Sequence, residues 1–236
     1  MVDCFALAEL PDEVTGFKYP LPNLAKALRG GGPVKIVAMG SSSTAGRQDV
    51  VPYPYWLEMY LRAATGNAKI DVINRGKGGE EAIEELPRFE EDIFTQSPSL
   101  VIWQVGTNAV FHKKDKHYDL DEVAAAIAQG LERLRGIDVV LIDPQYVPAM
   151  LLDDRAEDSE KIVRLISEAA ERERVNVFHR WALMRHWHVH NSISFERIID
   201  PTDPDKLHQS DASTQRLSRG LCDTILKAVA AAPPSA

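Results

Sequence analysis

The chain has 236 residues, of which 44% are hydrophobic, and this predicts one large domain with a sizeable core. A formal net charge of −8 argues against nucleic acid or an anionic membrane surface as partners and favours neutral or weakly charged ligands. No apolar run reaches the ~18 residues that a membrane span needs, and the first residues lack the basic-then-apolar layout of a signal peptide.

These features leave the compartment and the oligomeric state open. The default expectation is the cytoplasm, with the periplasm or secretion as the alternative if a signal sequence has been removed. Cys4 and Cys222 match no metal-binding spacing, so two unrelated thiols are expected. A disulfide between them stays possible and would indicate an oxidising compartment.

The predicted elements alternate between strands and helices. Residues 1–33 are expected to form an extended N-terminal arm with a glycine-rich hinge at 30–33, and residues 34–236 a single domain. Short apolar runs predict strands over 34–39, 69–74, 100–105, 137–143 and 175–178. Helical spacing predicts helices over 53–65, 80–96, 119–136, 159–174 and 213–231. This alternation is typical of an α/β fold with a doubly wound parallel sheet covered on both faces.

Glycine and polar residues follow each of the first three predicted strands. The segments are GSSSTAG after the first strand, RGKGGEE after the second and GTNAV after the third. Ligands of open parallel sheets bind beyond the carboxyl ends of the strands, near the point where strand order reverses. One edge of the sheet is therefore predicted to carry a site.

The serine-rich segment has three possible explanations. A turn that caps the next helix is the simplest, because hydroxyl side chains accept from free backbone N–H groups there. A phosphate loop requires glycine spacings that are absent, so no nucleotide cofactor is predicted. A nucleophilic serine remains possible, although the G-x-S-x-G elbow of common α/β-hydrolases is also absent.

A serine nucleophile needs a base and a carboxylate that orients this base. His208 is a candidate base because Asp205 precedes it by three residues on a short segment before the last predicted helix. One turn of chain could place both side chains on the same side. As an isolated pattern, however, Asp-x-x-His is more often a solvated turn.

The segments VAMGSSSTAG, VINRGKGGE, VIWQVGTNAV and DKLH occur in the order and strand context of the four sequence blocks of the SGNH hydrolases, the GDSL-type esterases and lipases. The chain resembles this family over about 34–228. The resemblance implies a three-layer α/β/α sandwich with a flavodoxin-like five-stranded parallel sheet in the order 2-1-3-4-5. That order would bring the first three loops together at the switch point.

The resemblance also implies roles for individual residues. Ser42 would be the nucleophile, His208 the base and Asp205 the residue that orients it. The oxyanion hole would consist of the backbone N–H groups of Ser42 and Gly76 and the side-chain amide of Asn108. No metal and no cofactor are implied.

Two positions depart from the pattern of the family. Ser41 stands where an aspartate usually precedes the nucleophile, and Ala109 stands where an acidic residue often follows the asparagine. Both changes indicate a distinct branch and weaken any transfer of substrate specificity.

The resulting hypothesis is a serine esterase that cleaves short acyl esters, such as acetyl esters of carbohydrates, through an acyl-enzyme. Short acyl groups are favoured because no long apolar insertion is present to cover a lipid chain. The alternatives are an acyltransferase that uses the same residues and a catalytically silent carbohydrate-binding module.

Three alternating histidines, His186, His188 and His190, could ligate a metal if they lay on a strand. An aromatic-rich surface segment is the preferred interpretation, because no carboxylate or cysteine is spaced to complete a metal site.

Overall fold

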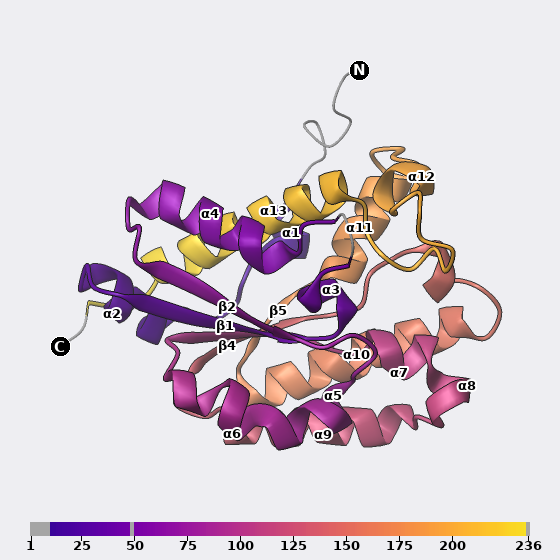
Figure 1. The fold of residues 1–236 in the computed structure, drawn as a ribbon, viewed down its shortest axis with the longest axis horizontal. Coiled ribbons are helices and arrows are strands. Elements are labelled where there is room, and N and C mark those ends of the chain that lie inside the picture. Colours follow the sequence, from indigo (N-terminus) through magenta and orange to yellow (C-terminus); the bar gives the residue numbers. More distant parts are fainter. Residues whose placement is uncertain (1–9, 48–49, 235–236) are drawn as a thin grey trace.

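The computed structural model describes residues 10–47 and 50–234. Its centre is a five-stranded parallel sheet in the order β2-β1-β3-β4-β5, which confirms the predicted topology (Figure 1). The strands are β1 (Val34–Gly40), β2 (Ile70–Gly76), β3 (Leu100–Gln104), β4 (Asp138–Ile142) and β5 (Asn176–Phe178). Each lies within two residues of the range that the sequence predicts.

Helices cover both faces of the sheet (Figure 1). One face carries α4 (Tyr53–Thr65), α11 (Arg180–Val189) and α13 (Asp211–Ala230), and the other carries α5 (Ala82–Glu85), α6 (Phe89–Asp92), α9 (Leu120–Arg133) and α10 (Arg155–Glu173). The shorter helices are α1 (Asp12–Thr15), α2 (Pro22–Arg29), α3 (Ser42–Ala45), α7 (Thr107–Phe111), α8 (Lys113–Lys116) and α12 (Phe195–Ile198), with 3₁₀ turns at Leu86–Arg88, Phe94–Gln96 and Pro148–Met150.

The helix predicted over 80–96 is broken into short pieces. Pro87 lies in the middle of this range, within the first 3₁₀ turn. Proline has no N–H to donate and its ring clashes with the preceding turn, so a continuous α-helix cannot pass through it. The break leaves the start of the segment, next to the second glycine-rich loop, free to turn toward β3.

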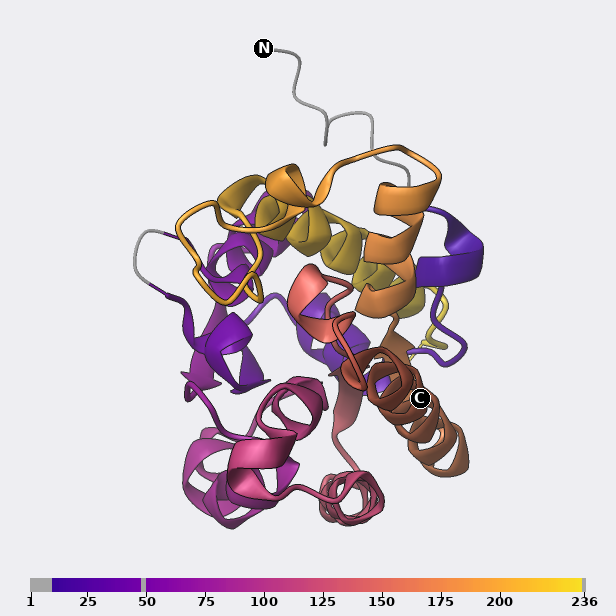
Figure 2. The same ribbon diagram turned by 90° about the vertical axis from the view of Figure 1, so that its right-hand side faces the viewer.

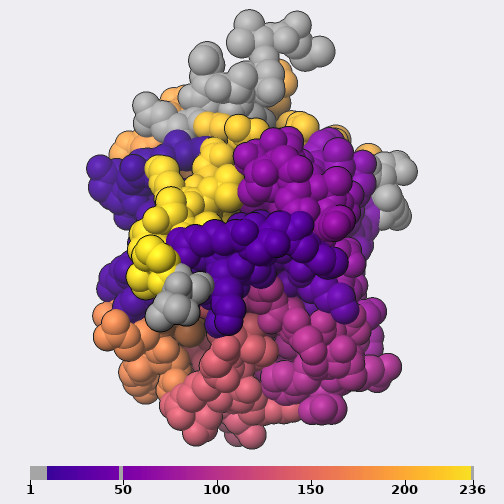
Figure 3. Space-filling model, turned by 90° about the vertical axis from the view of Figure 1, so that its left-hand side faces the viewer, coloured from indigo at the N-terminus to yellow at the C-terminus, as the bar shows by residue number. Residues whose placement is uncertain are grey.

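The described part of the N-terminal arm is helical rather than extended. The α2 helix buries Leu24 against the sheet, and the N–H of Leu24 donates to Asp138 at the start of β4. Arg29 donates to the carbonyl oxygens of Ala232 and Pro233, so the arm is tied to the end of the chain. Figure 3 shows the yellow C-terminal segment lying against the indigo arm.

Side chains from both faces of β3 and β4 are buried, as expected for central strands of a parallel sheet. Trp103, on β3, is completely buried, and its indole N–H donates to the carboxylate of Glu85. Among the described residues, no helix combines the length and apolarity required to cross a bilayer.

Candidate active site

The loops after β1, β2 and β3 meet at the carboxyl edge of the sheet. Because β1 lies between β2 and β3, the segments that begin at Ser41, Lys77 and Val105 are neighbours in space (Figure 2). The long segment between α12 and α13 approaches the same edge and carries His208. Four parts of the chain therefore converge where an open parallel sheet binds its ligands.

The chain turns sharply between β1 and α3, which presents Ser42 at the start of a short helix. Gly40 has a φ of 149°, and an added Cβ would lie only 2.4 Å from the Thr44 hydroxyl oxygen, so a side chain would be strained here. Ser41 is buried, and both its N–H and its hydroxyl donate to Oε1 of Gln104, at 3.1 and 3.0 Å. Gln104 thus accepts both hydrogen bonds from Ser41, the residue that stands where an aspartate was expected.

Ser42 and His208 are within hydrogen-bonding distance. The Ser42 Oγ lies 2.9 Å from Nε2 of the imidazole, and the His208 side chain is 14% exposed. On the other side of the ring, Nδ1 lies 2.9 Å from Oδ2 of Asp203, whose side chain has no exposed surface. With a proton on Nδ1, the ring donates to the carboxylate, and Nε2 is free to accept the serine proton.

The carboxylate of Asp203 is held in place by backbone groups as well as by the ring. The N–H groups of Leu207 and His208 donate to its Oδ2 at 2.9 and 2.7 Å. Burial alone would raise the pKa of this carboxyl, but the hydrogen bonds from the His208 backbone and ring, from Leu207 and from Arg47 together lower it well below its ordinary value. Asp203 is therefore ionised at neutral pH.

This geometry corrects the placement of Asp205 beside the imidazole. Asp205 is exposed, and its backbone N–H donates to Oδ1 of Asp203 over 3.4 Å. The chain reverses at Lys206, whose φ is 53°, so the tight turn carries the Asp203 carboxylate under the N–H groups that follow. Sequence reasoning considered only the Asp-x-x-His spacing, although the same segment, DPDKLH, contains a second aspartate.

Arg47 was also missed by sequence reasoning. Its Nη1 forms an ion pair with Oδ1 of Asp203 and lies 2.8 Å from Nδ1 of His208. An arginine N–H can bond to Nδ1 only when that nitrogen carries no proton, which is the tautomer that cannot accept from Ser42 through Nε2. In the tautomer that suits a base, Arg47 therefore acts on the ring through Asp203.

The structure does not leave the N–H of Gly76 available for a bound anion. Gly76 ends β2, and its N–H donates to Oδ1 of Asn74 at 2.9 Å. A Cβ at this position would lie 2.2 Å from the backbone nitrogen of Ala45 in α3. The glycine is required because β2 packs directly against the helix that carries Ser42, and its predicted role in the oxyanion hole would require its hydrogen bond to Asn74 to break.

The next two glycines, Gly78 and Gly79, are better candidates for the oxyanion hole than Gly76. A Cβ added to Gly78 would lie 3.8 Å from the Cβ of Ser42. Within residues 10–47 and 50–234, no acceptor is found for the N–H groups of Ser42, Gly78 or Gly79. Sequence reasoning chose the first glycine of RGKGGEE, and the structure shows that this glycine ends β2, before the loop in which Gly78 approaches Ser42.

Asn108 is buried in the first turn of α7, after β3. Its side-chain Nδ2 donates at 2.7 Å to the carbonyl oxygen of Glu80, the residue that follows Gly79. One amide hydrogen is thus fixed by the neighbouring loop, and the amide group carries a second. The structure brings Asn108 to the glycine loop that adjoins Ser42.

A pocket adjoins the pair formed by Ser42 and His208. It offers about 510 Å³, including its opening to solvent, and is lined in addition by Arg47, Tyr53, Arg180 and Leu217, among others. Arg180 is buried and donates to the carbonyl oxygen of Asp143, and burial lowers the pKa of its guanidinium to about 10. A mainly apolar pocket with a few polar groups is typical of a small-molecule site.

The three alternating histidines do not lie on a strand. His186 and His188 belong to α11 and His190 follows it. One face of the helix brings the rings of His186 and His190 to 4.9 Å, whereas His188 stacks on Phe195. In the part of the chain that the structure describes, no group of three or more histidine, cysteine or acidic residues is arranged to hold a metal.

Cys4 lies outside the described residues, so its possible disulfide with Cys222 stays a prediction. Cys222 is buried in α13, and burial raises the pKa of its thiol to about 12.

Several known proteins are similar to this chain. It is 26% identical over 119 residues to an acetylxylan esterase of Geobacillus stearothermophilus, and 34% identical over 83 residues to the uncharacterized lipoprotein YqeF of Bacillus subtilis. These alignments cover 47% and 34% of this chain. They span only 54% of the esterase and 33% of the lipoprotein.

Solved structures share the fold. A crystal structure of the Geobacillus stearothermophilus acetylxylan esterase superposes with a TM-score of 0.68 at 21% identity, covering 82% of this chain and 95% of that chain. An α/β hydrolase enzyme from the metagenome of Lake Arreo, Spain, also gives 0.68, at 19% identity, covering 84% and 96%.

The family match covers more of the chain than either pairwise alignment. The matched family is close to the GDSL-type esterases and lipases that the sequence resembles, but it is a different family. Ser41 replaces the aspartate of the GDS sequence and donates to Gln104 instead, in keeping with this difference. The match covers residues 7–231, and the chain therefore belongs to the non-GDSL lipase-like family.

Proposed function

We propose that this protein is a serine ester hydrolase that removes short acyl groups, acetyl above all, from a carbohydrate or another small alcohol. The observation that carries the proposal is the continuous contact from Ser42 through His208 to the buried carboxylate of Asp203. A hydroxyl, an imidazole and a carboxylate in this order can activate the serine oxygen for attack on a carbonyl carbon.

The first half of the reaction forms the acyl-enzyme. Ser42 Oγ attacks the ester carbonyl carbon while His208 Nε2 takes the serine proton, and Asp203 stabilises the imidazolium that results. The carbonyl oxygen becomes an oxyanion, for which the N–H groups of Ser42 and of the Gly78–Gly79 loop and the amide of Asn108 are the proposed donors. The carbon–oxygen bond of the ester then breaks, and the alcohol leaves with the proton from His208.

The second half regenerates the serine. Water attacks the acyl carbon and gives a proton to His208, and the second oxyanion uses the same donors. When this intermediate collapses, Ser42 Oγ recovers the proton and the carboxylic acid is released. If a sugar hydroxyl took the place of water, the same residues would transfer the acyl group.

The relatives support an acetyl ester as substrate. One aligned relative is an acetylxylan esterase, and catalytic mutants of that enzyme change a serine, an aspartate and a histidine. The aspartate of that enzyme precedes the histidine by three residues, which is the spacing of Asp205 rather than Asp203.

The direct test is turnover on p-nitrophenyl esters from acetate to palmitate, beside acetylated xylo-oligosaccharides. We expect activity to be highest on acetate and to be lost in Ser42→Ala by several orders of magnitude, while Ser43→Ala keeps most of it. Mass spectrometry after reaction with a fluorophosphonate should place the adduct on Ser42. An adduct on Ser43, or full activity in Ser42→Ala, would refute the proposal.

A further inference from the structure

A second buried carboxylate lies on the oxyanion side of the site. Glu81 is 2% exposed and follows the glycine loop, directly before α5. Its Oε1 accepts from the backbone N–H of Gly106 at 2.8 Å and from that of Ala82 at 3.0 Å. Its Oε2 accepts from the backbone N–H of Ala109 at 3.0 Å. Two of these three donors belong to the other loop, after β3.

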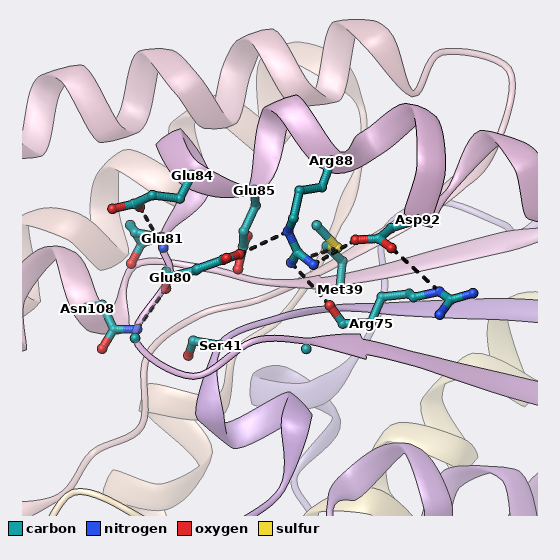
Figure 4. Close-up of polar contacts among 12 residues, drawn as sticks. Met39, Ser41, Arg75, Glu80, Glu81, Glu84, Glu85, Arg88, Asp92 and Asn108 are labelled. Atoms are coloured by element: carbon teal, nitrogen blue, oxygen red, sulfur yellow. Dashed lines mark hydrogen bonds and ion pairs between the residues drawn. The ribbon is translucent and has the colours of Figure 1, made fainter.

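The two loops are also bonded through the side chain of Asn108. Asn108 lies between the two backbone donors, Gly106 and Ala109, and its amide donates to the carbonyl oxygen of Glu80 (Figure 4). Glu80 and Glu81, which follow the glycine loop, therefore accept three hydrogen bonds from the segment 106–109. With bonds on both sides of Asn108, neither its backbone nor its amide can rotate without breaking one of them.

In the part of the chain that the structure describes, the hydrogen bonds to the Glu81 carboxylate come from backbone N–H groups and none comes from a cation. Burial raises the pKa of this carboxyl, the three N–H groups lower it, and the nearby charge of Glu84 raises it again, so that it lies above its ordinary value. A buried carboxylate without a cationic partner costs stability. If helix capping were its only task, a small polar residue at the N-terminus of α5 would provide it without this cost.

We propose that Glu81 is a positioning residue for the oxyanion hole, holding Asn108 of α7 against the Gly78–Gly79 loop. The inference rests on the proposed function of Asn108 as an oxyanion donor. Glu81 does not touch the substrate. It fixes the distance between two donors that come from different strands, and an oxyanion hole stabilises charge only when its donors are already in place.

The main variant is Glu81→Gln, which keeps the size of the side chain but replaces one acceptor oxygen with an NH₂ group facing backbone N–H groups. We expect kcat on p-nitrophenyl acetate to fall about 10- to 100-fold with little change in KM, because the lost alignment matters mainly in the transition state. The matched control is Glu85→Gln. Glu85 is equally buried and bonds to Trp103, not to α7. This control should keep kcat within about threefold.

A double-mutant cycle with Asn108→Ala separates positioning from general stability. If Glu81 acts through the Asn108 amide, adding Glu81→Gln to Asn108→Ala should cost little further activity. If the two losses multiply, Glu81 does not act through Asn108 and the proposal is wrong.

Two readouts do not depend on ester turnover. The rate at which a fluorophosphonate labels Ser42 should fall in Glu81→Gln and not in Glu85→Gln. In the unaltered protein, the amide protons of Gly106 and Ala109 should exchange with solvent at least tenfold more slowly than those of Gly78 and Gly79. Fast exchange at Gly106 and Ala109 would overturn the positioning role of Glu81 even if the esterase proposal stood. Slow exchange without any ester turnover would instead support the contacts of Glu81 and reject the esterase proposal.

Discussion

Asp203 and Glu81 are two buried carboxylates that differ in the groups around them. Asp203 contacts the His208 ring, whereas Glu81 contacts the segment that carries Asn108. At Asp203, hydrogen bonds from the backbone and ring of His208, from Leu207 and from Arg47 outweigh the effect of burial, and the pKa is lowered. At Glu81, burial outweighs the three backbone N–H groups, and the pKa is raised. The balance between burial and hydrogen bonds therefore sets the direction of each shift.

The difference fits the tasks proposed for the two residues. A carboxylate that stabilises an imidazolium must keep its charge while a proton moves nearby, and the hydrogen bonds to Asp203 favour its ionised form. A residue that only fixes geometry needs acceptor oxygens in the right places. Glu81 accepts from Gly106, just before α7, and from Ala109 within it.

The largest expected effect distinguishes Asp203 from Asp205. Asp203→Asn should lower kcat/KM by about 10³- to 10⁴-fold, because an amide can hold the imidazole in the wrong tautomer. Asp205→Asn should stay within a few-fold of the unaltered protein, since this side chain is exposed. Steady-state kinetics on p-nitrophenyl acetate measures both. The reverse ranking would show that the acetylxylan esterase spacing applies here and that the observed turn is not the catalytic arrangement.

A smaller effect is expected from the cation. Arg47→Met removes the guanidinium that pairs with Oδ1 of Asp203 and leaves this carboxylate with its N–H donors. We expect kcat/KM to fall by about 3- to 10-fold, because the carboxylate beside His208 is then held by fewer partners and Arg47 is partly exposed. Steady-state kinetics on p-nitrophenyl acetate, with Lys206→Met as an exposed control, tests this. An unchanged kcat/KM in Arg47→Met would contradict it.

The smallest effects concern stability, and they have opposite signs for the two carboxyls. A lowered pKa means that Asp203 stabilises the folded protein above its unfolded pKa of about 3.9, and that this contribution is lost as pH falls below it. A raised pKa means that ionised Glu81 destabilises the folded protein at neutral pH. This cost is relieved as pH falls through the folded pKa toward about 4.3.

Thermal unfolding can separate the two contributions. As pH falls from 7 toward about 4.3, the Tm of the unaltered protein should rise relative to that of Glu81→Gln. Between pH 5 and 3, it should fall relative to that of Asp203→Asn. Each 1 kcal/mol corresponds to about 2–4 °C in a chain of this size, so differences of a few degrees are expected. Parallel curves for all three proteins would show that the two carboxyls titrate as they do in the unfolded chain.

The sequence by itself determined the fold class. Alternating apolar runs and helical spacing predict every strand and the long helices α4, α9, α10 and α13, because burial on both faces of a parallel sheet leaves a strong pattern. The same sequence predicted that Ser42 and His208 would belong to one site, and the structure places them 2.9 Å apart.

Only the tertiary structure decided which neighbours contact that pair. Asp203, and not Asp205, contacts the imidazole because the chain reverses at Lys206, and the N–H of Gly76 donates to Asn74. Arg47 and Glu81 reach the site from loops whose spacing carries no periodic signal. A pattern along the chain reports which faces are buried. Whether a particular N–H or carboxylate finds a partner depends on distances between segments far apart in sequence, and these are set only when the sheet brings its carboxyl edge together.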